Sequence, residues 1–423
     1  MGETEIRERE STVAETRSQA KKRRFPSTSD LMTLPGKQQA RYWAAGGAAV
    51  LALAGALFWW QGTPVHLDAI VIQASKGEPG LAGGLREEII SDLRRAPGLR
   101  VVSEPAPSPA ITGVLEVEAE RSADRVRVVA ELRRSDGHRY WTRHFDRPLS
   151  GLPGTAEEIA AAINPKVKKR VPRHKPVPAA YQAYLEGRYD FEQPDGNGLA
   201  KAIAQFQSAT EKDSDFALAW SWLSIAQEYQ VDRGAARPND SLPEARDAAD
   251  LALALDPDLA EAHLAMGIDY LQYDWQWHDA KAELDRAAQL SPGSALVAYW
   301  RQRWNAAMGR GPEPDFHFAN LPPIHSEDDA RKLLEDADDI RVETYISPAA
   351  LALVASQIHD TQSAMHWLDV AYEEHCVHLP YVVWNSELPR SDPRFADLLR
   401  RMGLQPQQAR NRLTGGSAAE SGA

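Results

Sequence analysis

The sequence contains one cysteine, Cys376, among its 423 residues. A single thiol excludes an internal disulfide and a zinc site built from several thiolates. Motifs that identify many enzymes are also absent. We find no glycine-rich phosphate loop ending in Lys-Ser/Thr, no Gly-x-Gly-x-x-Gly, no Gly-x-Ser-x-Gly turn and no His-Glu-x-x-His helix. We therefore predict no catalytic, cofactor-binding or metal-binding residue, and we expect a chain that is not an enzyme.

One short segment carries side chains that could hold a metal ion. His375 and His378 flank Cys376, but no further ligand is placed by spacing, so a loop after a helix explains the segment more simply. Trp275 and Trp277 could stack on a ligand, although tryptophans at the end of a helix more often pack in a core. An enzyme whose site no motif reveals stays a distant alternative.

After the first 41 residues, acidic residues outnumber basic ones. Residues 1–41 hold 9 Lys/Arg against 6 Asp/Glu, which leaves 39 against 54 and a net charge of −15 for the remainder. Nucleic-acid surfaces depend on clustered positive charge, so the acidic body argues against a nucleic-acid partner. The polar residues 1–41 and the tail 405–423 cannot bury enough apolar surface to fold, and we expect both to be disordered.

Charge disappears between Tyr42 and Leu67, which hold no Asp, Glu, Lys or Arg. Residues 42–60 are long enough to cross a bilayer as a helix, with aromatic side chains at both ends. Basic residues precede this segment, so we expect a single-pass anchor in a bacterial inner membrane, with a cytoplasmic N-terminus and a periplasmic body. A cleaved signal peptide and a buried core helix are the alternatives. Small residues at every fourth position suggest self-association into a homodimer: Ala44, Ala48, Ala52 and Ala56.

Residues 64–165 have the pattern of a small α+β domain. Apolar residues with helical spacing predict helices over 81–95 and 156–163. Short apolar or alternating runs predict strands, and turn residues separate them. The expected strands are 65–73, 99–103, 111–119, 125–132 and 140–145.

An ordered series of motifs in this part resembles a known periplasmic domain. It runs from Leu85-Arg-Glu-Glu-Ile-Ile through Gly113-Val-Leu-Glu-Val to Phe145-Asp-Arg and Glu157-Glu-Ile-Ala. The series is similar to the N-terminal domain of TolB, as found just outside the anchor of bacterial membrane regulators. The segment after the first strand departs from the pattern, because it is shortened to Ser75-Lys-Gly-Glu-Pro-Gly80.

Internal repetition follows in residues 179–310. Ala202, Ala245 and Ala280 each begin a similar run of small and large apolar residues, with steps of 43 and 35 residues. The longer step contains an apparent insertion at 234–243, rich in Gly, Pro, Asn and Asp. A unit of about 34 residues is typical of two antiparallel helices that stack on the next unit.

These runs resemble the tetratricopeptide repeat (TPR). The resemblance implies an α-solenoid in which small residues allow close helix packing. The residues that would pack the repeats are Trp220, Leu223, Ala245, Ala252, Pro257, Gly267, Tyr270, Ala280, Ala287 and Pro292. Some repeats of this kind bind a partner's C-terminal carboxylate through Lys, Asn and Arg, but the corresponding face here is more apolar. We therefore expect a groove for a helix or an extended segment, lined by Leu218, Ser221, Trp222, Ile225, Glu228, Tyr229, Glu261, Leu264, Ile268 and Leu271.

The remaining residues extend this pattern more weakly. Residues 311–344 are rich in Pro, Gly and acidic residues and predict an irregular connection or a degraded repeat, with one acidic helix at 328–339. Residues 345–404 predict further TPR-like helices. The chain thus resembles bacterial membrane-bound TPR and CadC-type regulators that lack the DNA-binding domain. We expect a mainly α scaffold that binds proteins in the periplasm, with a sensor that signals through its membrane helix as the alternative.

Overall fold

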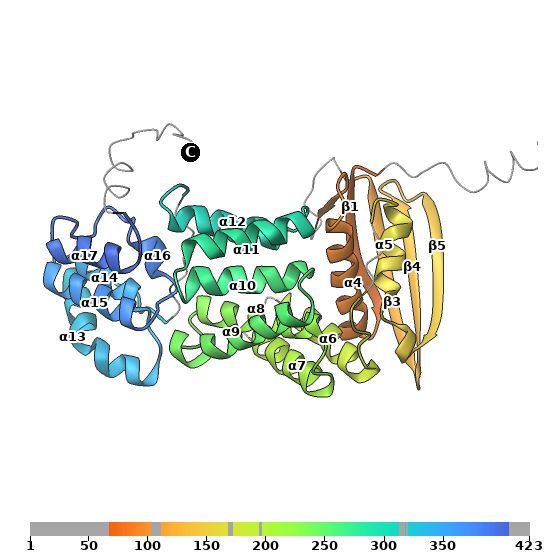
Figure 1. The fold of residues 1–423 in the computed structure, drawn as a ribbon, viewed down its shortest axis with the longest axis horizontal. Helices are drawn as coiled ribbons and strands as arrows, with labels where there is room; N and C mark the ends of the chain where they lie inside the picture. Colours follow the sequence, from red (N-terminus) through yellow and green to blue (C-terminus); the bar gives the residue numbers. More distant parts are fainter. Residues whose placement is uncertain are drawn as a thin grey trace, which may run out of the picture. The chain divides into compact units, whose positions relative to one another are not determined.

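A computed structural model describes residues 67–102, 111–167, 172–193, 197–312, 318 and 320–405 (Figure 1). This part of the chain is mainly helical and contains one five-stranded sheet, which confirms the prediction of a mainly α chain with a small mixed α/β portion. The proposed membrane segment 42–60, its alanine ladder and the leader 1–41 lie outside the described residues. Among the helices that are described, none combines the length and the apolar character needed to cross a bilayer.

The sheet is mixed and has the order β2-β1-β3-β4-β5. Strand β1 is parallel to both β2 and β3, and β4 is antiparallel to its neighbours β3 and β5. Side chains along β3 and β4 alternate between buried and more exposed positions, as expected for a sheet covered on one face. The strands are β1 (Ala69–Gly77), β2 (Arg100–Val102), β3 (Gly113–Ser122), β4 (Arg125–Arg134) and β5 (Arg139–Pro148).

Two helices, α4 (Pro79–Arg94) and α5 (Thr155–Ile163), pack against each other, and α4 packs on β1 and β3. The structure corrects the first predicted strand, which begins four residues later and continues to Gly77. Of the shortened segment 75–80, residues 75–77 belong to β1 and residues 79–80 begin α4. Gly77 has φ +100°, and a Cβ atom there would lie 1.9 Å from the Ala119 carbonyl oxygen, so only glycine allows β1 to end against β3.

Seven helices follow, and consecutive helices pack side by side (Figure 1). The closest pairs are α6 with α7, α8 with α9, and α10 with α11, while α8 also packs on α10. The helices are α6 (Pro178–Phe191), α7 (Gly198–Lys212), α8 (Ala217–Asp232), α9 (Pro238–Leu255), α10 (Ala260–Gln272), α11 (Trp277–Leu290) and α12 (Ala295–Ala307).

The repeated alanines occupy equivalent places in three pairs. Ala202 in α7, Ala245 in α9 and Ala280 in α11 are all 0% exposed. Each of these helices ends in the same turn, in which the amide of residue 213, 256 or 291 donates to the carbonyl of the alanine four residues earlier. Of the ten residues predicted to pack the repeats, Pro257 and Pro292 lie exposed in these turns, Trp220 and Tyr270 are partly buried, and the other six are buried.

Glycines allow the two helices of a pair to pack closely in two of the three pairs, α6 with α7 and α10 with α11. A Cβ atom at Gly187 in α6 would lie 2.7 Å from the ring of Phe206 in α7. A Cβ atom at Gly267 in α10 would lie 2.8 Å from Cγ of Leu284 in α11. Ala226 is fully buried in α8, between these glycines in the chain. Close contact between small and large residues therefore recurs along the stacked helices.

The predicted insertion at 234–243 is mostly not a loop. Helix α9 begins at Pro238 and contains Pro243 in its second turn. Pro238 is tolerated at the first position because the N–H that it lacks has no partner there, whereas Pro243 lies inside the helix and removes one hydrogen bond to the carbonyl four residues earlier. The extra residues thus lengthen α9 at its N-terminal end.

The C-terminal part contains five helices around one apolar cluster. The acidic helix expected at 328–339, within the predicted connection 311–344, is present as α13, which spans 327–343. Ser326 caps this helix by accepting a hydrogen bond from the Asp329 amide. Acidic residues fill the first turn, where their negative charge interacts favourably with the positive end of the helix dipole. The helices are α13 (Glu327–Glu343), α14 (Pro348–Gln357), α15 (Thr361–Glu373), α16 (Leu379–Val382) and α17 (Pro393–Arg401).

Candidate functional site

The ten residues predicted to line a partner groove do not form an open groove. Three of them are partly buried, namely Leu218, Tyr229 and Glu261. The other seven are at most 5% exposed: Ser221, Trp222, Ile225, Glu228, Leu264, Ile268 and Leu271. The face of α8 and α10 that the repeat pattern turns inward is therefore covered by the chain itself.

Neighbouring helices and α4 provide this cover. The Trp222 indole lies 5.3 Å from the Phe191 ring, and the Arg188 guanidinium lies 3.8 Å from the indole centroid. At the start of α10, the Glu261 carboxylate accepts a hydrogen bond of 3.0 Å from the Ser91 hydroxyl of α4. The sheet portion thus contacts the very helices that were expected to receive a partner.

Glycines bring α4 into direct backbone contact with α6. A Cβ atom at Gly84 would lie 2.2 Å from the Leu185 carbonyl oxygen, and one at Gly83 would lie 2.2 Å from the Tyr189 ring. Farther along α4, the Arg94 carbonyl accepts a hydrogen bond of 2.8 Å from the Gly293 amide. This packing leaves no room for a side chain, so it joins the sheet portion to the helical repeats as one unit.

Beside this contact lies a cavity of about 350 Å³, within the size range of small-ligand sites. Its walls come from α4 and α5 on one side and from the segment before α6, α8 and the end of α9 on the other. Leu218 is the only residue of the predicted groove among those that line it. The remaining lining residues are Glu88, Asp92, Arg95, Pro153, Gly154, Ala156, Glu157, Glu158, Pro172, Arg173, His174, Lys175, Pro176, Tyr181, Asp215, Phe216, Ala217, Leu255 and Asp256.

Two carboxylates one helical turn apart on α4 face this cavity. The Tyr181 hydroxyl of α6 donates a hydrogen bond to Glu88. Burial raises the pKa of Glu88 from 4.5 to about 7, and the Asp92 carboxylate adds to the rise. Asp92 itself lies 2.5 Å from the Arg95 guanidinium, which also lies 3.5 Å from Glu157 of α5.

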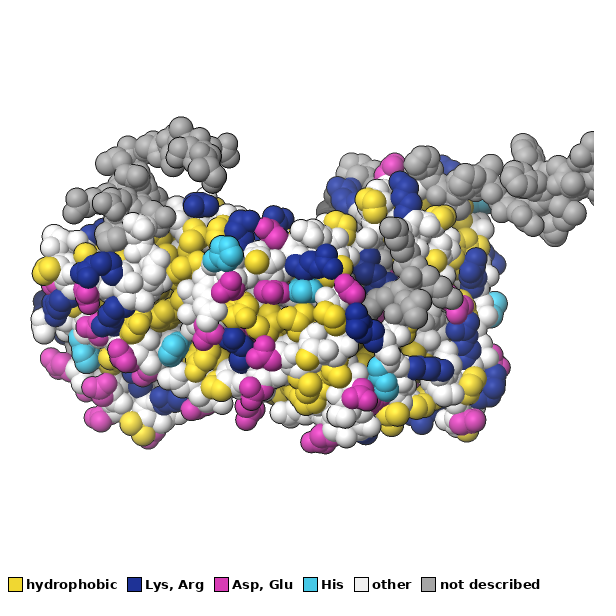
Figure 2. Space-filling view, in the orientation of Figure 1, with side chains coloured by type: hydrophobic (Ala, Val, Ile, Leu, Met, Phe, Trp, Pro, Cys, Tyr) yellow, Lys and Arg dark blue, Asp and Glu magenta, His cyan; other side chains and the backbone are white. Residues whose placement is uncertain are grey.

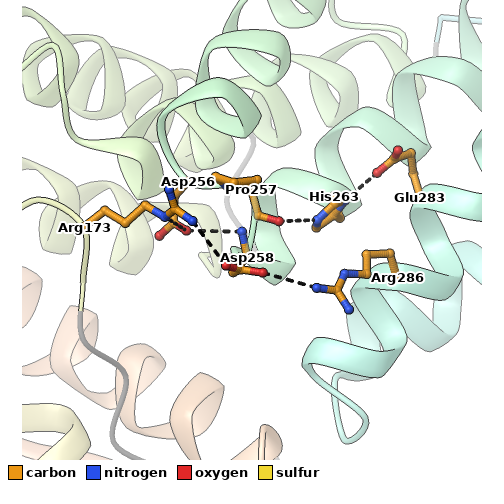
Figure 3. A network of polar contacts seen from close by, with 7 residues as sticks. All are labelled: Arg173, Asp256, Pro257, Asp258, His263, Glu283 and Arg286. Atoms are coloured by element: carbon orange, nitrogen blue, oxygen red, sulfur yellow. Dashed lines mark hydrogen bonds and ion pairs between the residues drawn. The ribbon is translucent and has the colours of Figure 1, made fainter.

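The basic residues before α6 are held by carboxylates at helix ends (Figure 3). Arg173 lies 3.6 Å from Asp256 and 3.3 Å from Asp258, both in the turn between α9 and α10. Asp258 also pairs with Arg286 of α11 at 3.2 Å, and the carbonyl of the same turn's Pro257 lies 2.9 Å from a His263 ring nitrogen. His174, which Figure 3 omits, lies 2.9 Å from the buried Asp213. These contacts fix the segment that forms one wall of the cavity.

Apolar side chains form another part of the cavity wall. Phe216 and Ala217 are buried, while Leu218 and Leu255 are partly exposed and pack on the cluster around Ala252 and Leu259. Figure 2 shows hydrophobic side chains gathered in a band over the middle of the helical part. In α9, Leu251 is 38% exposed. The cavity therefore combines carboxylates with an apolar wall.

A second group of carboxylates lies deep between α8 and α10. Glu228 and Asp269 are 0% exposed, and neither oxygen of Glu228 has a hydrogen-bond partner in the described part of the chain. Burial raises the pKa of Glu228 well above its ordinary value, and Asp269 and Asp232 add to the rise. The ion pair between Arg246 and Asp269 partly offsets the cost of burying these charges.

The segment His375–His378 is part of the C-terminal core. Cys376 is fully buried, with Sγ 3.3 Å from the Ser347 hydroxyl, which in turn lies 3.2 Å from Nδ1 of His378. The His375 ring stacks on Trp275, and Nε1 of Trp277 donates to the Met402 carbonyl. Within the described residues, no group of three or more His, Cys, Asp or Glu side chains could hold a metal ion.

Sequence reasoning missed the cavity, although part of its signal was present. Glu88 and Asp92 have the i, i+4 spacing that places two side chains on one helix face. Their helix was predicted, but its contact with α6 was not. No family model matches the chain, and no curated protein matches it at a significant level.

Proposed function

We propose that this chain is a scaffold of the TPR type that binds a protein partner. The observation that carries this proposal is the recurrence of one helix-pair geometry. Fully buried alanines occupy equivalent places in α7, α9 and α11, and each of these helices ends in the same turn. Stacked helix pairs of this kind present extended surfaces, and their usual role is to bind other polypeptides.

The binding surface in this proposal differs from the groove expected from the sequence. The inner face of α8 and α10 is filled by packing, so it offers nothing to a partner without unfolding. The cavity wall around Leu218 and Leu255, together with the exposed Leu251, combines apolar side chains with charged ones. Interfaces commonly have an apolar centre surrounded by polar groups.

Attachment to a membrane is a second part of the proposal. Residues 42–60 would hold the scaffold at a bilayer by one spanning helix, with the helical repeats on the periplasmic side. Support for this comes from the uncharged run, its aromatic ends and the basic residues before it.

Quantitative cross-linking of the intact chain in cells of its source, followed by mass spectrometry, tests the binding function. The informative variant is Leu218→Asp with Leu251→Asp, because both side chains are at least partly exposed. The matched control is Val342→Asp on α13, which is 79% exposed and does not line the cavity. Circular dichroism of each purified variant verifies folding.

The proposal expects one or a few proteins to cross-link to the native chain and to the control, and to be lost from the double variant. If the double variant cross-links to the same proteins as the native chain, the binding surface lies elsewhere on the molecule. A native chain that cross-links to no protein above background would contradict the scaffold function itself.

A further inference from the structure

Strand β5 forms one edge of the sheet, and within the described residues no strand pairs with its outer side (Figure 1). The strand at the opposite edge, β2, has three residues, whereas β5 has ten. From position 141 to 148, β5 pairs with β4 without a break in register, and its one proline is its last residue. Folded proteins commonly protect a sheet edge by shortening it, bulging it or placing proline in it. None of these devices closes the middle of β5 to a further strand.

One face of β5 carries a row of large side chains at this edge. Trp141 and Phe145 are partly exposed, and Arg143 lies exposed between them. The three side chains point to the same side of the sheet, because they are two residues apart. The β4 residues paired with them are all 0% exposed: Leu132, Ala130 and Val128. The apolar layer on the covered side of the sheet therefore reaches the open edge at Trp141 and Phe145.

Arg143 is the one arginine of β5 that has no acidic partner within the described part of the chain. Arg139 lies 3.2 Å from Glu131, and Arg147 lies 2.7 Å from Glu158 of α5. The Arg143 guanidinium instead lies over the Trp141 ring, 5.5 Å from its centroid. A guanidinium that is free of ion pairs can form two parallel hydrogen bonds with a carboxylate.

The charge of β5 is opposite to that of the chain as a whole. The strand holds three arginines against one aspartate, whereas the chain has a net charge of −12. Like charges directly opposite one another in paired strands are destabilising, so the arginines disfavour pairing between two copies of β5. By the same rule, they favour a strand that places a carboxylate opposite Arg143.

We propose that β5 is the docking edge for an extended acidic segment of a protein partner, which adds to the sheet as a further strand. In that segment an acidic residue faces Arg143, and apolar residues two positions before and after it pack on Trp141 and Phe145. Backbone hydrogen bonds to the edge supply affinity, and the alternate side chains supply specificity. The docking edge belongs to the sheet portion and is separate from the proposed repeat surface around Leu218.

Fluorescence anisotropy of labelled peptides, titrated with the intact chain in mild detergent, measures this binding. The probe is Thr-Val-Thr-Glu-Thr-Val-Thr, and the comparison peptide has lysine in place of glutamate. Two further versions of the probe carry N-methyl groups on alternate amides, one at the odd positions and one at the even positions. A peptide that adds as a strand directs only one of these two sets toward its neighbour.

The glutamate probe should bind about tenfold or more tightly than the lysine peptide, because like-charge repulsion replaces a charge-assisted hydrogen bond. Arg143→Glu should reverse this preference, and the matched control Arg100→Glu, exposed on the opposite edge strand β2, should keep it. N-methylation of one set of amides should abolish binding, and N-methylation of the other set should not. Hydrogen exchange should show that the bound probe protects residues 139–148. Circular dichroism establishes that both variants are folded.

Equal binding of the glutamate and lysine peptides, or an unchanged preference in Arg143→Glu, would overturn the proposal. Equal loss of binding with either N-methylated set would also overturn it, because the peptide would then not lie at the edge as a strand. Protection of residues 139–148 that rises with protein concentration without peptide would assign the edge to a second copy instead. Failure of the repeat surface is distinguishable, because Leu218→Asp with Leu251→Asp should leave binding of the glutamate probe unchanged.

Discussion

The contact between Gly267 and Leu284 allows a quantitative test of the repeated packing. Leu284 is 1% exposed, and Leu284→Ala should cost about 3 kcal/mol of unfolding free energy, within the range found for buried leucines. Gly267→Ala would place a Cβ atom 2.8 Å from Cγ and 2.9 Å from Cδ2 of Leu284. The strain of such overpacking destabilises the protein by about 2 kcal/mol. The better helix propensity of alanine offsets about 1 kcal/mol of this, so the net destabilisation is about 1 kcal/mol.

Combining the two substitutions should reverse the sign of the glycine change. In the Leu284→Ala background, Cγ and Cδ2 are absent, so the new methyl group fills part of the cavity. Gly267→Ala should then stabilise by about 1 kcal/mol instead of destabilising by about 1 kcal/mol, which gives a coupling energy of about 2 kcal/mol.

Urea unfolding followed by circular dichroism measures the four free energies of this cycle. Gly267→Ala combined with Phe206→Leu is the control, because the Phe206 ring packs on Gly187 in a different helix pair. That combination should be additive within about 0.5 kcal/mol. The reasoning is refuted if Gly267→Ala destabilises the protein equally with leucine and with alanine at position 284.

Three further predictions concern buried polar groups. Burial raises the folded-state pKa of Glu228 above its ordinary value of 4.5, so its contribution to stability is present below pH 4.5 and is lost as pH rises. Glu228→Gln should therefore increase the unfolding free energy more at pH 8 than at pH 5, and an equal effect at both pH values would be inconsistent with this origin. Arg303 lies 2.8 Å from Asp232 and is 3% exposed, so Arg303→Met should cost about 3–5 kcal/mol in urea unfolding, whereas a cost below 1 kcal/mol would contradict the pairing. Burial raises the pKa of Cys376, but His378 and Ser347 outweigh it and bring the value to about 7. The thiol should nevertheless react with Ellman's reagent only after unfolding, because it is 0% exposed, and fast labelling of the native chain would refute its burial.

Local patterns of the sequence determined which segments form helices and strands. Alternation along 125–132 predicts a strand because successive side chains point to opposite faces, and β4 lies there. The alanines at 202, 245 and 280 predict helix pairs because close packing needs small side chains, and all three are fully buried. These features depend on residues near one another in the chain.

Only the tertiary structure decided which faces stay open. Trp222 and Leu264 were expected in a groove, but α4, from a part of the chain more than 120 residues earlier, packs beside them and lines the same small cavity. The cavity between α4 and α8 arises for the same reason, since Glu88 and Leu218 come together only when the sheet portion docks on α6. Burial depends on long-range contacts, and periodicity in one segment carries no information about what another segment will cover.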